Sequence, residues 1–377
     1  MSVIFPPAAV GVLGGGQLGR FFLQSARRQG YRTVVWDPDP MCPARMDSDV
    51  HICLPYDSSD AFKEFSNLCK AATIEFENVP SLLLSSLSSK LRVSPSANAV
   101  EICSNRILEK SFLKSNGFPV VDYCEISSEE DCRLVPSSMF PAILKTARMG
   151  YDGRGQFTVL DSSALLEAWL SLGVECVLEK RLSSEMIEFS VVTGRLDSGQ
   201  VVLFPVTRNL HRGGILCYSS TICNIDNDVT DQLCHIASLI AQRLYYVGVL
   251  SIEFFYDRSK LYVNEMAPRP HNTGHYTMDA MSYSQFDCQQ KILCGLEVFQ
   301  PRKLNDAAMV NLLGDGFSNG VPDWSSLLNS GGRLYIYGKY DARPGRKMGH
   351  VTWSGVPEYI LDASIEFYRD FYNLEDR

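Results

Sequence analysis

The stretch Ala9-Val10-Gly11-Val12-Leu13-Gly14-Gly15-Gly16-Gln17-Leu18-Gly19 opens the part of the chain that decides its fold class. Residues 9–13 are mostly β-branched or apolar and predict a strand, which the three consecutive glycines end in a turn. Residues 17–29 show the spacing of an amphipathic helix, and residues 33–36 predict a second strand. Strand, turn, helix and strand in this order are typical of the start of a parallel α/β sheet.

The glycine turn has three interpretations. Gly14, Gly16 and Gly19 match the G-x-G-x-x-G pattern of a dinucleotide site, with Asp37 at the end of the next predicted strand. A close-packed strand-to-helix turn that binds nothing would favour the same glycines. The N–H groups, together with Gln17, could instead hold another phosphate, such as that of a sugar phosphate.

Composition narrows the function classes. The chain has 377 residues, more than one hydrophobic core usually supports, so we expect two or three packed units. With 35 basic and 43 acidic residues the formal charge is −8, which disfavours nucleic acid as a partner. There is no signal peptide and no apolar run that could span a bilayer, so we expect a cytoplasmic protein without membrane contact. The twelve cysteines form no C-x-x-C pair and are expected to be reduced thiols.

A second glycine-rich segment follows a predicted strand that ends at Lys145. A helix is predicted over 101–115, and residues 148–156 hold three glycines and two arginines. Glycines let the backbone approach an anion and move on closure, while Lys145 and the arginines supply positive charge. The segment therefore suits a lid over phosphates, with an exposed hairpin loop as the alternative.

Two glutamates fall on neighbouring predicted strands. A hairpin with residues 258–260 as its loop would put Glu253 directly opposite Glu265. Facing carboxylates repel, but as hard oxygen ligands they suit Mg²⁺ and hence a nucleotide triphosphate. Asn264 would add an oxygen only if the strand ends or bulges there, because regular alternation turns it to the other face. Two solvated glutamates on the outer face are the alternative.

Two further segments are rich in side chains that bind ligands. Residues 267–275 form a polar loop stiffened by prolines, and such loops often carry function. Lys339 and residues 343–350 form a basic cluster in an acidic protein, which suits a phosphate monoester. A solvated basic face is the alternative.

Five of these segments occur together, in the same order, in one enzyme family. They are Gly14-Gly15-Gly16-Gln17-Leu18-Gly19-Arg20, Glu75-Phe76-Glu77-Asn78-Val79-Pro80, Gly150-Tyr151-Asp152-Gly153-Arg154-Gly155-Gln156, Asn264-Glu265-Met266-Ala267-Pro268-Arg269 and Arg343-Pro344-Gly345-Arg346-Lys347-Met348-Gly349-His350. With this set, from about Val10 to about Trp353, the chain resembles the 5-(carboxyamino)imidazole ribonucleotide synthases, ATP-grasp enzymes of purine biosynthesis.

The resemblance implies a three-part ATP-grasp fold of the α/β and α+β classes. Residues 1–100 would form a Rossmann-like domain with a parallel sheet, which in this family carries no dinucleotide. Residues 101–185 would form the small ATP-grasp lobe with the glycine-rich lid. Residues 186–377 would form the large lobe and a small C-terminal β-rich portion that binds substrate. The resemblance also implies a homodimer.

ATP and Mg²⁺ are the cofactors that the resemblance implies. Arg106 and Lys145 would contact the phosphates, residues 179–182 would form the hinge that holds adenine, and Glu188 would bind the ribose. The nucleotide-binding set would be Arg106, Lys145, Gly150, Tyr151, Asp152, Gly153, Arg154, Gly155, Gln156, Glu179, Lys180, Arg181, Leu182, Glu188, His211, Asn264 and Glu265. Glu253 and Glu265 would ligate the metal.

The implied substrates are ATP, bicarbonate and 5-aminoimidazole ribonucleotide. The ribonucleotide would be held by Gln17, Glu75, Tyr151, Arg154, Arg269, His271, Asn272, Lys339, Arg346 and Lys347. The catalytic residues would be Lys145, Arg154, Arg269 and His271. Bicarbonate would attack the γ-phosphorus to give carboxyphosphate and ADP, and the carboxyl group would pass, directly or as CO₂, to the exocyclic amine.

The chain departs from the family pattern at two places. Met149 stands where the family usually has a second glycine, so we expect a stiffer lid at that end. The spacing from Glu179 to Glu188 is one residue longer than usual and lacks the usual aromatic residue, which puts the hinge and ribose contacts in question.

Three other functions stay open at this point. Another ATP-grasp ligase or formyl-group transferase acting on a purine precursor would share the lid and the paired glutamates. An NAD-dependent oxidoreductase would use the glycine turn but leaves the glutamates unexplained. A non-catalytic nucleotide-binding scaffold would not need every charged position that the family pattern places on phosphate or metal.

Overall fold

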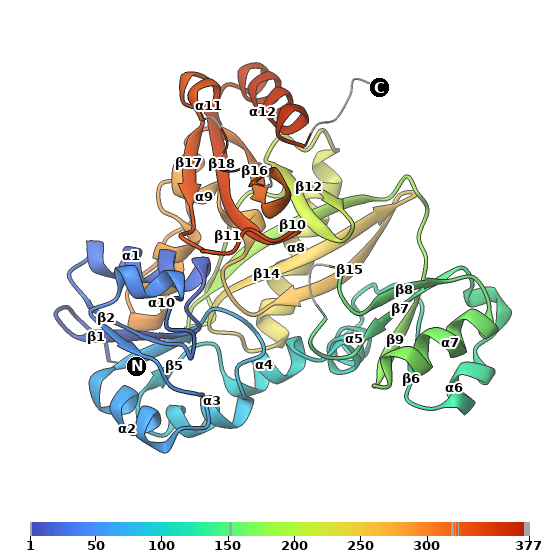
Figure 1. Cartoon of the computed structure of the whole chain (residues 1–377), viewed down its shortest axis with the longest axis horizontal. Coiled ribbons are helices and arrows are strands. Elements are labelled where there is room, and N and C mark those ends of the chain that lie inside the picture. Colours follow the sequence, from blue (N-terminus) through green and yellow to red (C-terminus); the bar gives the residue numbers. More distant parts are fainter. Residues whose placement is uncertain (1, 151–152, 318–319, 321, 323, 373–377) are drawn as a thin grey trace.

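The computed structural model describes residues 2–150, 153–317, 320, 322 and 324–372 (Figure 1). Three β-sheets follow one another along the chain. In Figure 1 the first lies at the lower left, the second at the right, and the third runs from the centre to the top. Within the described part of the chain, every helix is too short or too polar to cross a membrane.

The first sheet is parallel throughout, in the order β3-β2-β1-β4-β5. This confirms the parallel α/β start predicted from the glycine turn. The central strand is buried on both faces, as in other parallel sheets. The elements of this part are β1 (Ala9–Leu13), α1 (Gln17–Arg28), β2 (Arg32–Trp36), η1 (Pro43–Asp47), β3 (Val50–Ile52), α2 (Ser59–Leu68), β4 (Ala71–Ile74), α3 (Ser81–Ser88), β5 (Arg92–Val93) and α4 (Ala97–Cys103).

The single helix predicted over 101–115 is wrong, because the chain breaks there into α4 and α5 (Arg106–Ser115). Asn105 is extended, and its side-chain oxygen accepts hydrogen bonds from the N–H groups of Ile107 and Leu108. Asparagine is among the best N-cap residues, so the side chain competes with helix continuation and starts a new helix. Arg106 therefore stands in the first turn of α5.

The second sheet is antiparallel, in the order β6-β9-β7-β8. Apolar side chains of α6 and α7 pack against it to form a separate core. Its elements are β6 (Tyr123–Ile126), α6 (Glu129–Leu134), η2 (Ser137–Met139), β7 (Ala142–Thr146), β8 (Gln156–Val159), α7 (Ser162–Leu172) and β9 (Cys176–Lys180).

The third sheet has nine strands and is antiparallel, in the order β15-β14-β10-β12-β13-β16-β18-β17, with β11 paired to β10. The C-terminal strands thus continue the sheet that begins at β10. Its elements are β10 (Ile187–Arg195), β11 (Val201–Leu203), β12 (Thr207–Arg212), β13 (Ile215–Ser220), α8 (Asn227–Arg243), β14 (Gly248–Asp257), β15 (Lys260–Ala267), η3 (Asn272–Gly274), α9 (Thr277–Ala280), α10 (Gln285–Cys294), β16 (Asp306–Leu313), η4 (Gly314–Phe317), α11 (Ser325–Asn329), β17 (Arg333–Ile336), β18 (Lys347–Gly355) and α12 (Pro357–Phe371). The predicted domain boundaries at 100 and 185 stay predictions.

The hairpin of β14 and β15 places Glu253 directly opposite Glu265, as predicted, but the turn and the strand register differ from the prediction. The predicted three-residue loop is wrong, because Asp257 pairs with Lys260 and only two residues turn. Both turn residues have positive φ, which matches the strand twist of a two-residue hairpin. A β-bulge at Asn264 then shifts the register by one and turns Glu265 to the face of Glu253.

A buried aromatic cluster joins the N-terminal part of the molecule to the part built on the third sheet. His275 stacks on His350 with ring centroids 4.5 Å apart, and His350 stacks on Tyr335 at 4.6 Å. Phe21 of α1 packs its ring against these side chains. Neither ring nitrogen of His275 has a hydrogen-bond partner among the described residues, so the ring is held here by packing.

We predict that His275→Phe flattens the pH dependence of stability. Burial, with a contribution from the charge of Lys347, lowers the pKa of His275 to about 3. Below about pH 6.5 the unfolded chain therefore binds a proton that the folded chain does not, and stability is lost as the pH falls. In urea unfolding, the parent should lose about 1 kcal/mol more than the variant between about pH 6.5 and 5.5. Parallel curves would contradict this assignment.

Candidate active site

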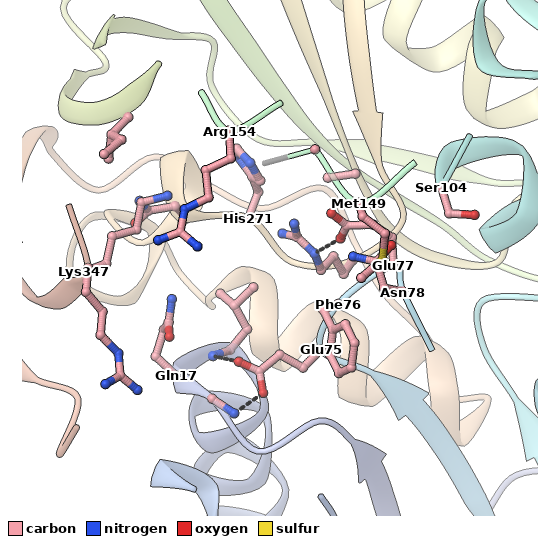
Figure 2. A pocket seen from close by; sticks show the side chains of 18 of the residues that line it. Gln17, Glu75, Phe76, Glu77, Asn78, Ser104, Met149, Arg154, His271 and Lys347 are labelled. Carbon is pink, nitrogen blue, oxygen red and sulfur yellow. Dashed lines mark hydrogen bonds and ion pairs between the residues drawn. The ribbon is translucent and has the colours of Figure 1, made fainter. Parts of the chain in front are cut away.

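A cavity of about 760 Å³ lies between the three sheets. It is lined by every described residue that the sequence predicted for the ribonucleotide, and Figure 2 shows part of this set. These residues are Gln17, Glu75, Arg154, Arg269, His271, Asn272, Lys339, Arg346 and Lys347. The tenth predicted residue, Tyr151, lies outside the described residues. The fold thus gathers one predicted site from segments more than 300 residues apart in the chain.

The predicted nucleotide residues divide into two groups. Arg106, Gly150, Arg154 and Glu265 line the cavity itself. Beyond its walls lie Lys145, Gly153, Gly155, Gln156, Glu179, Lys180, Arg181, Leu182, Glu188, His211 and Asn264, as does Glu253 of the metal pair. Asp152 lies outside the described residues.

The glycine turn is filled by carboxylates of the chain itself. Gly15 donates its N–H to Asp37 Oδ2 at 2.6 Å, and the N–H groups of Gly16 and Leu18 are donated to Glu75 (Figure 2). A Cβ at Gly16 would collide with the Glu75 carboxylate, and one at Gly19 would lie 2.6 Å from the Gly14 carbonyl oxygen. The helix N-terminus therefore already holds its anion, and the glycines serve a close-packed turn.

Glu75 is poised between two charge states. Burial raises its pKa to about 7, against the opposing effects of Lys339 and of the bound Gly16 N–H. Its carboxylate caps α1 and at the same time forms part of the cavity wall, with Gln17 beside it (Figure 2). Because the Glu75 carboxylate both caps α1 and faces the cavity, a ligand in the cavity can affect the stability of the N-terminal part.

Basic side chains form the wall that faces Glu75. Lys339 and Arg346 come from the segment between β17 and β18, Lys347 begins β18, and Arg154 comes from the glycine-rich segment before β8. Arg269 donates Nε to Glu77 at 2.8 Å, which fixes the guanidinium at the cavity surface. The cavity therefore presents several cations within a protein of net negative charge, as an anionic ligand requires.

The pKa values of the two facing carboxylates, Glu253 and Glu265, are shifted in opposite directions. Burial and the neighbouring Glu265 raise the pKa of Glu253 to about 7. Burial also opposes ionisation of Glu265, but Arg106, whose Nη1 lies 2.9 Å from Oε2, outweighs it and keeps the pKa below the ordinary value. Two carboxylates on one face, one of them shifted toward protonation by burial and by the charge of the other, fit a site whose ligand is a cation.

A metal at this pair would need further ligands from outside the protein. Among the described residues, no three histidine, cysteine, aspartate or glutamate side chains converge on one point. Mg²⁺ is usually held by one or two carboxylates together with substrate phosphates and water. The buried Oδ1 of Asn264, beside Glu265, also lacks a hydrogen-bond partner within the described residues. The donor set therefore fits a nucleotide-bound Mg²⁺.

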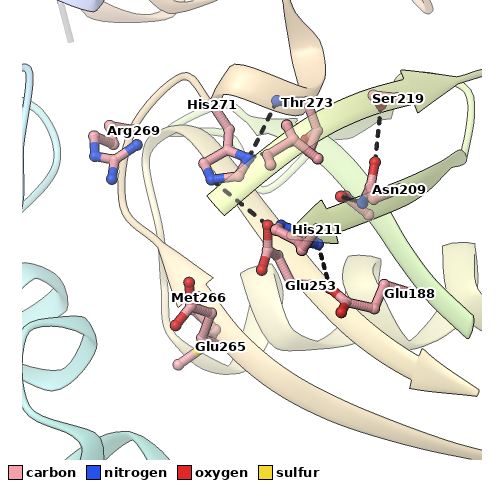
Figure 3. A network of polar contacts seen from close by, with 12 residues as sticks. Glu188, Asn209, His211, Ser219, Glu253, Glu265, Met266, Arg269, His271 and Thr273 are labelled. Carbon is pink, nitrogen blue, oxygen red and sulfur yellow. Dashed lines mark hydrogen bonds and ion pairs between the residues drawn. The ribbon is translucent and has the colours of Figure 1, made fainter. Parts of the chain in front are cut away.

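Two histidines flank Glu253 (Figure 3). His211 Nδ1 lies 2.5 Å from Glu188 Oε2, and this contact raises the pKa of His211 despite its burial. His271 Nε2 lies 3.7 Å from Glu253 Oε1, while its Nδ1 is 2.9 Å from Thr273 Oγ1. Burial and the charge of Arg269 lower the pKa of His271 well below its usual value, so this ring is neutral at pH 7. A neutral ring so placed can hold or pass on a proton.

Lys145 is held by Glu179 rather than by solvent. Its Nζ lies 2.7 Å from Glu179 Oε2, and the fully buried Lys110 lies 3.2 Å from Oε1 of the same carboxylate. Burial opposes ionisation of Glu179, but the two lysines keep its pKa far below the ordinary value. The Glu179 carboxylate is thus engaged by two buried lysines, and the adenine hinge predicted for residues 179–182 stays a prediction.

The structure accounts for both departures from the family pattern. Met149 has a φ of +61°, a conformation that glycine adopts easily and other residues rarely adopt, and the stiffer lid expected at this end stays a prediction. The longer connection between β9 and β10 is anchored by Ser183, whose N–H and hydroxyl are both donated to Asp257 at the end of β14. The extra residue is therefore absorbed in a loop, and Glu188 remains on β10.

Sequence reasoning assigned no site role to Glu77 or Glu109, named Asp37 only for a dinucleotide, and named Arg343 only as part of the basic cluster. The structure places all four in the cavity wall, where Asp37 and Glu77 bind backbone or side-chain partners. Glu109 and Lys110 had a detectable signal, because they lie three and four positions after Arg106 and so share its helix face.

Three family models match the chain in succession. They are the ribonucleotide synthetase preATP-grasp domain (residues 8–104), the ATP-grasp domain (residues 111–286) and the phosphoribosylaminoimidazole carboxylase C-terminal domain (residues 307–358). The N5-carboxyaminoimidazole ribonucleotide synthase of Bacillus subtilis strain 168 is 36% identical over 361 residues, which cover 95% of this chain and 94% of that protein. The chain belongs to the N5-carboxyaminoimidazole ribonucleotide synthase family. The predicted family and ATP-grasp fold are thereby confirmed.

Solved structures of the family agree. An N5-carboxyaminoimidazole ribonucleotide synthetase in its ADP complex superposes with a TM-score of 0.91 at 32% identity, covering 100% of this chain and 99% of that one. The Staphylococcus aureus family member complexed with ADP gives 0.89 at 33% identity, covering 98% and 99%. The dinucleotide interpretation of the glycine turn finds no support in this family or in the geometry of the turn.

We predict that Glu75→Ala destabilises the fold through the helix N-terminus. Removing the carboxylate leaves two N–H groups of the α1 region without their acceptor, which should cost about 1–3 kcal/mol. The free energy of urea unfolding measures this, with Glu64→Ala, an exposed glutamate of α2, as the control. A loss within about 0.5 kcal/mol of the control would show that the turn does not depend on Glu75.

Proposed function

We propose that this enzyme is an ATP-dependent carbon–nitrogen ligase that carboxylates the exocyclic amine of 5-aminoimidazole ribonucleotide. The products are 5-carboxyaminoimidazole ribonucleotide, ADP and phosphate, and the reaction belongs to de novo purine biosynthesis. The observation that carries this proposal is the single cavity in which the predicted ribonucleotide residues meet Arg106 and Glu265. Membership of the family supports it.

The ribonucleotide occupies the end of the cavity between the glycine turn and the basic wall. Lys339, Arg346 and Lys347 bind its phosphate through charge-assisted hydrogen bonds. Gln17 and Glu75 lie at the opposite wall and suit its hydroxyl groups, because a carboxylate and an amide both accept hydrogen bonds. Arg154 from the lid closes this end.

ATP occupies the adjoining region between the two ATP-grasp lobes. Arg106 and Lys145 contact its phosphates, the backbone of residues 179–182 holds adenine, and Glu188 binds the ribose with His211 beside it. Glu253 and Glu265 hold Mg²⁺, with Asn264 as a neighbouring oxygen donor. When bound, the ion neutralises charge that develops on the transferring phosphoryl group.

The chemistry needs positioning and electrostatic stabilisation rather than an enzyme nucleophile. A bicarbonate oxygen attacks the γ-phosphorus, the bond to ADP breaks, and carboxyphosphate forms, with Lys145 and Arg154 stabilising the charge. The exocyclic amine then takes the carboxyl group, directly or as CO₂, and phosphate and a proton leave. Arg269 orients the bicarbonate, the neutral His271 accepts the proton, and the closed lid excludes water.

A homodimer and a cytoplasmic location complete the proposal. The homodimer rests on the family resemblance, and the cytoplasmic location rests on the sequence features described above. Light scattering on the purified chain determines the first.

The test measures ADP release from MgATP with bicarbonate and 5-aminoimidazole ribonucleotide, each alone and both together. Release should require bicarbonate and rise strongly when the ribonucleotide is added, because the carboxyl acceptor completes the reaction. Glycinamide ribonucleotide with formate is the control pair for another ATP-grasp ligase. Release that responds to that pair and ignores bicarbonate would contradict the proposed substrates while leaving the fold assignment intact.

A further inference from the structure

One face of α5 clasps the bulge of β15 at three points. Arg106 Nη1 lies 2.9 Å from Glu265 Oε2, and Lys110 Nζ donates to the Asn264 carbonyl oxygen at 2.9 Å. The Met266 N–H is donated to Glu109 Oε1 at 2.5 Å. Positions 106, 109 and 110 share a helix face, so a single turn of α5 reaches three successive residues of the strand.

The bulge explains why these contacts exist. A bulge interrupts the ladder between β14 and β15 and leaves backbone groups without strand partners. Buried backbone groups need a partner, and α5 supplies one to the carbonyl of Asn264 and one to the N–H of Met266. Glu109 and Lys110 are buried to 1% exposure or less, so these contacts are shielded from water.

Lys110 also contacts Glu179 on β9, in the second sheet. Its Nζ also lies 3.2 Å from Glu179 Oε1, and the other oxygen of that carboxylate holds Lys145 at 2.7 Å. One ammonium group therefore joins the strand that carries Glu265 to the lysine on β7. The chain of contacts Asn264–Lys110–Glu179–Lys145 crosses from the large sheet to the small one.

We propose that Glu109 and Lys110 are positioning residues that set the metal-binding bulge and the phosphate-binding lysine relative to each other. Neither side chain is assigned to substrate, nucleotide or metal. The inference rests on the proposed nucleotide site and deepens it. Lys110 makes the affinity for nucleotide depend on Mg²⁺ by fixing Asn264 and Glu265 next to Lys145.

The experiment compares ADP affinity with Mg²⁺ and with EDTA in the parent, Lys110→Met and Lys114→Met. Lys114 is an exposed lysine one turn further along α5 and is the matched control. Lys110→Met should reduce the tightening of ADP binding by Mg²⁺ by about tenfold, while Lys114→Met retains the parental ratio. A purely structural role would instead lower the melting temperature and weaken both affinities in the same proportion. A folded Lys110→Met with the parental ratio would overturn the proposal.

A second pair of variants decides the matter if Lys110→Met does not fold. Glu109→Leu removes the acceptor of the Met266 N–H, whereas Glu109→Gln keeps an oxygen there. The leucine variant should lose more of the Mg²⁺ effect than the glutamine variant, and equal parental ratios in both would refute the clasp. The readout uses neither bicarbonate nor ribonucleotide. Failure of the proposed carboxylation would therefore appear separately, as a parent that binds MgADP but does not release ADP in response to those substrates.

Discussion

The bulge at Asn264 is the constraint on which the active site depends. Without it, the two-residue turn at Arg258 and Ser259 would place Asn264 opposite Glu253 and turn Glu265 toward the apolar core. One extra residue instead brings two carboxylates to one face, where burial and the charge of Glu265 raise the pKa of Glu253. Arg106 of α5 offsets this unfavourable pairing, and the cation proposed for this site would offset it further.

The N-terminal part also lines this cavity, and carboxylates of the chain itself bind the N–H groups of its glycine turn. In a dinucleotide site the glycine turn leaves its N–H groups to a pyrophosphate, whereas here Asp37 and Glu75 accept them. The helix end is therefore satisfied internally, and the cavity is displaced toward the basic segment around Lys347. The same Rossmann-like scaffold thus forms one wall of the cavity proposed for the ribonucleotide, and its glycine turn is filled by side chains of the chain itself.

Local patterns predicted much of this, and contacts between distant segments account for the rest. Strand alternation and hairpin geometry predicted Glu253 opposite Glu265, and the ordered motifs predicted the residues that line the cavity. The capping of the glycine turn by Glu75 joins positions 59 residues apart, which no local pattern encodes. A lysine in a helix is usually a surface residue, but the partners of Lys110, Glu179 and Asn264, lie 69 and 154 positions further along the chain. Helix spacing places such a residue on the face of Arg106, but its burial and its partners can be recognised only once the fold brings these segments together.

The most direct test of the account is a measurement of Mn²⁺ binding, by electron paramagnetic resonance, to the ADP complex of the parent, Glu253→Gln and Glu265→Gln. If the bulge creates one metal site from both strands, the parent should bind one Mn²⁺ tightly per nucleotide. Each single substitution should then weaken that binding by about tenfold or more, with ADP still bound. Retention of parental Mn²⁺ affinity in either variant would contradict the claim that this register makes the metal site.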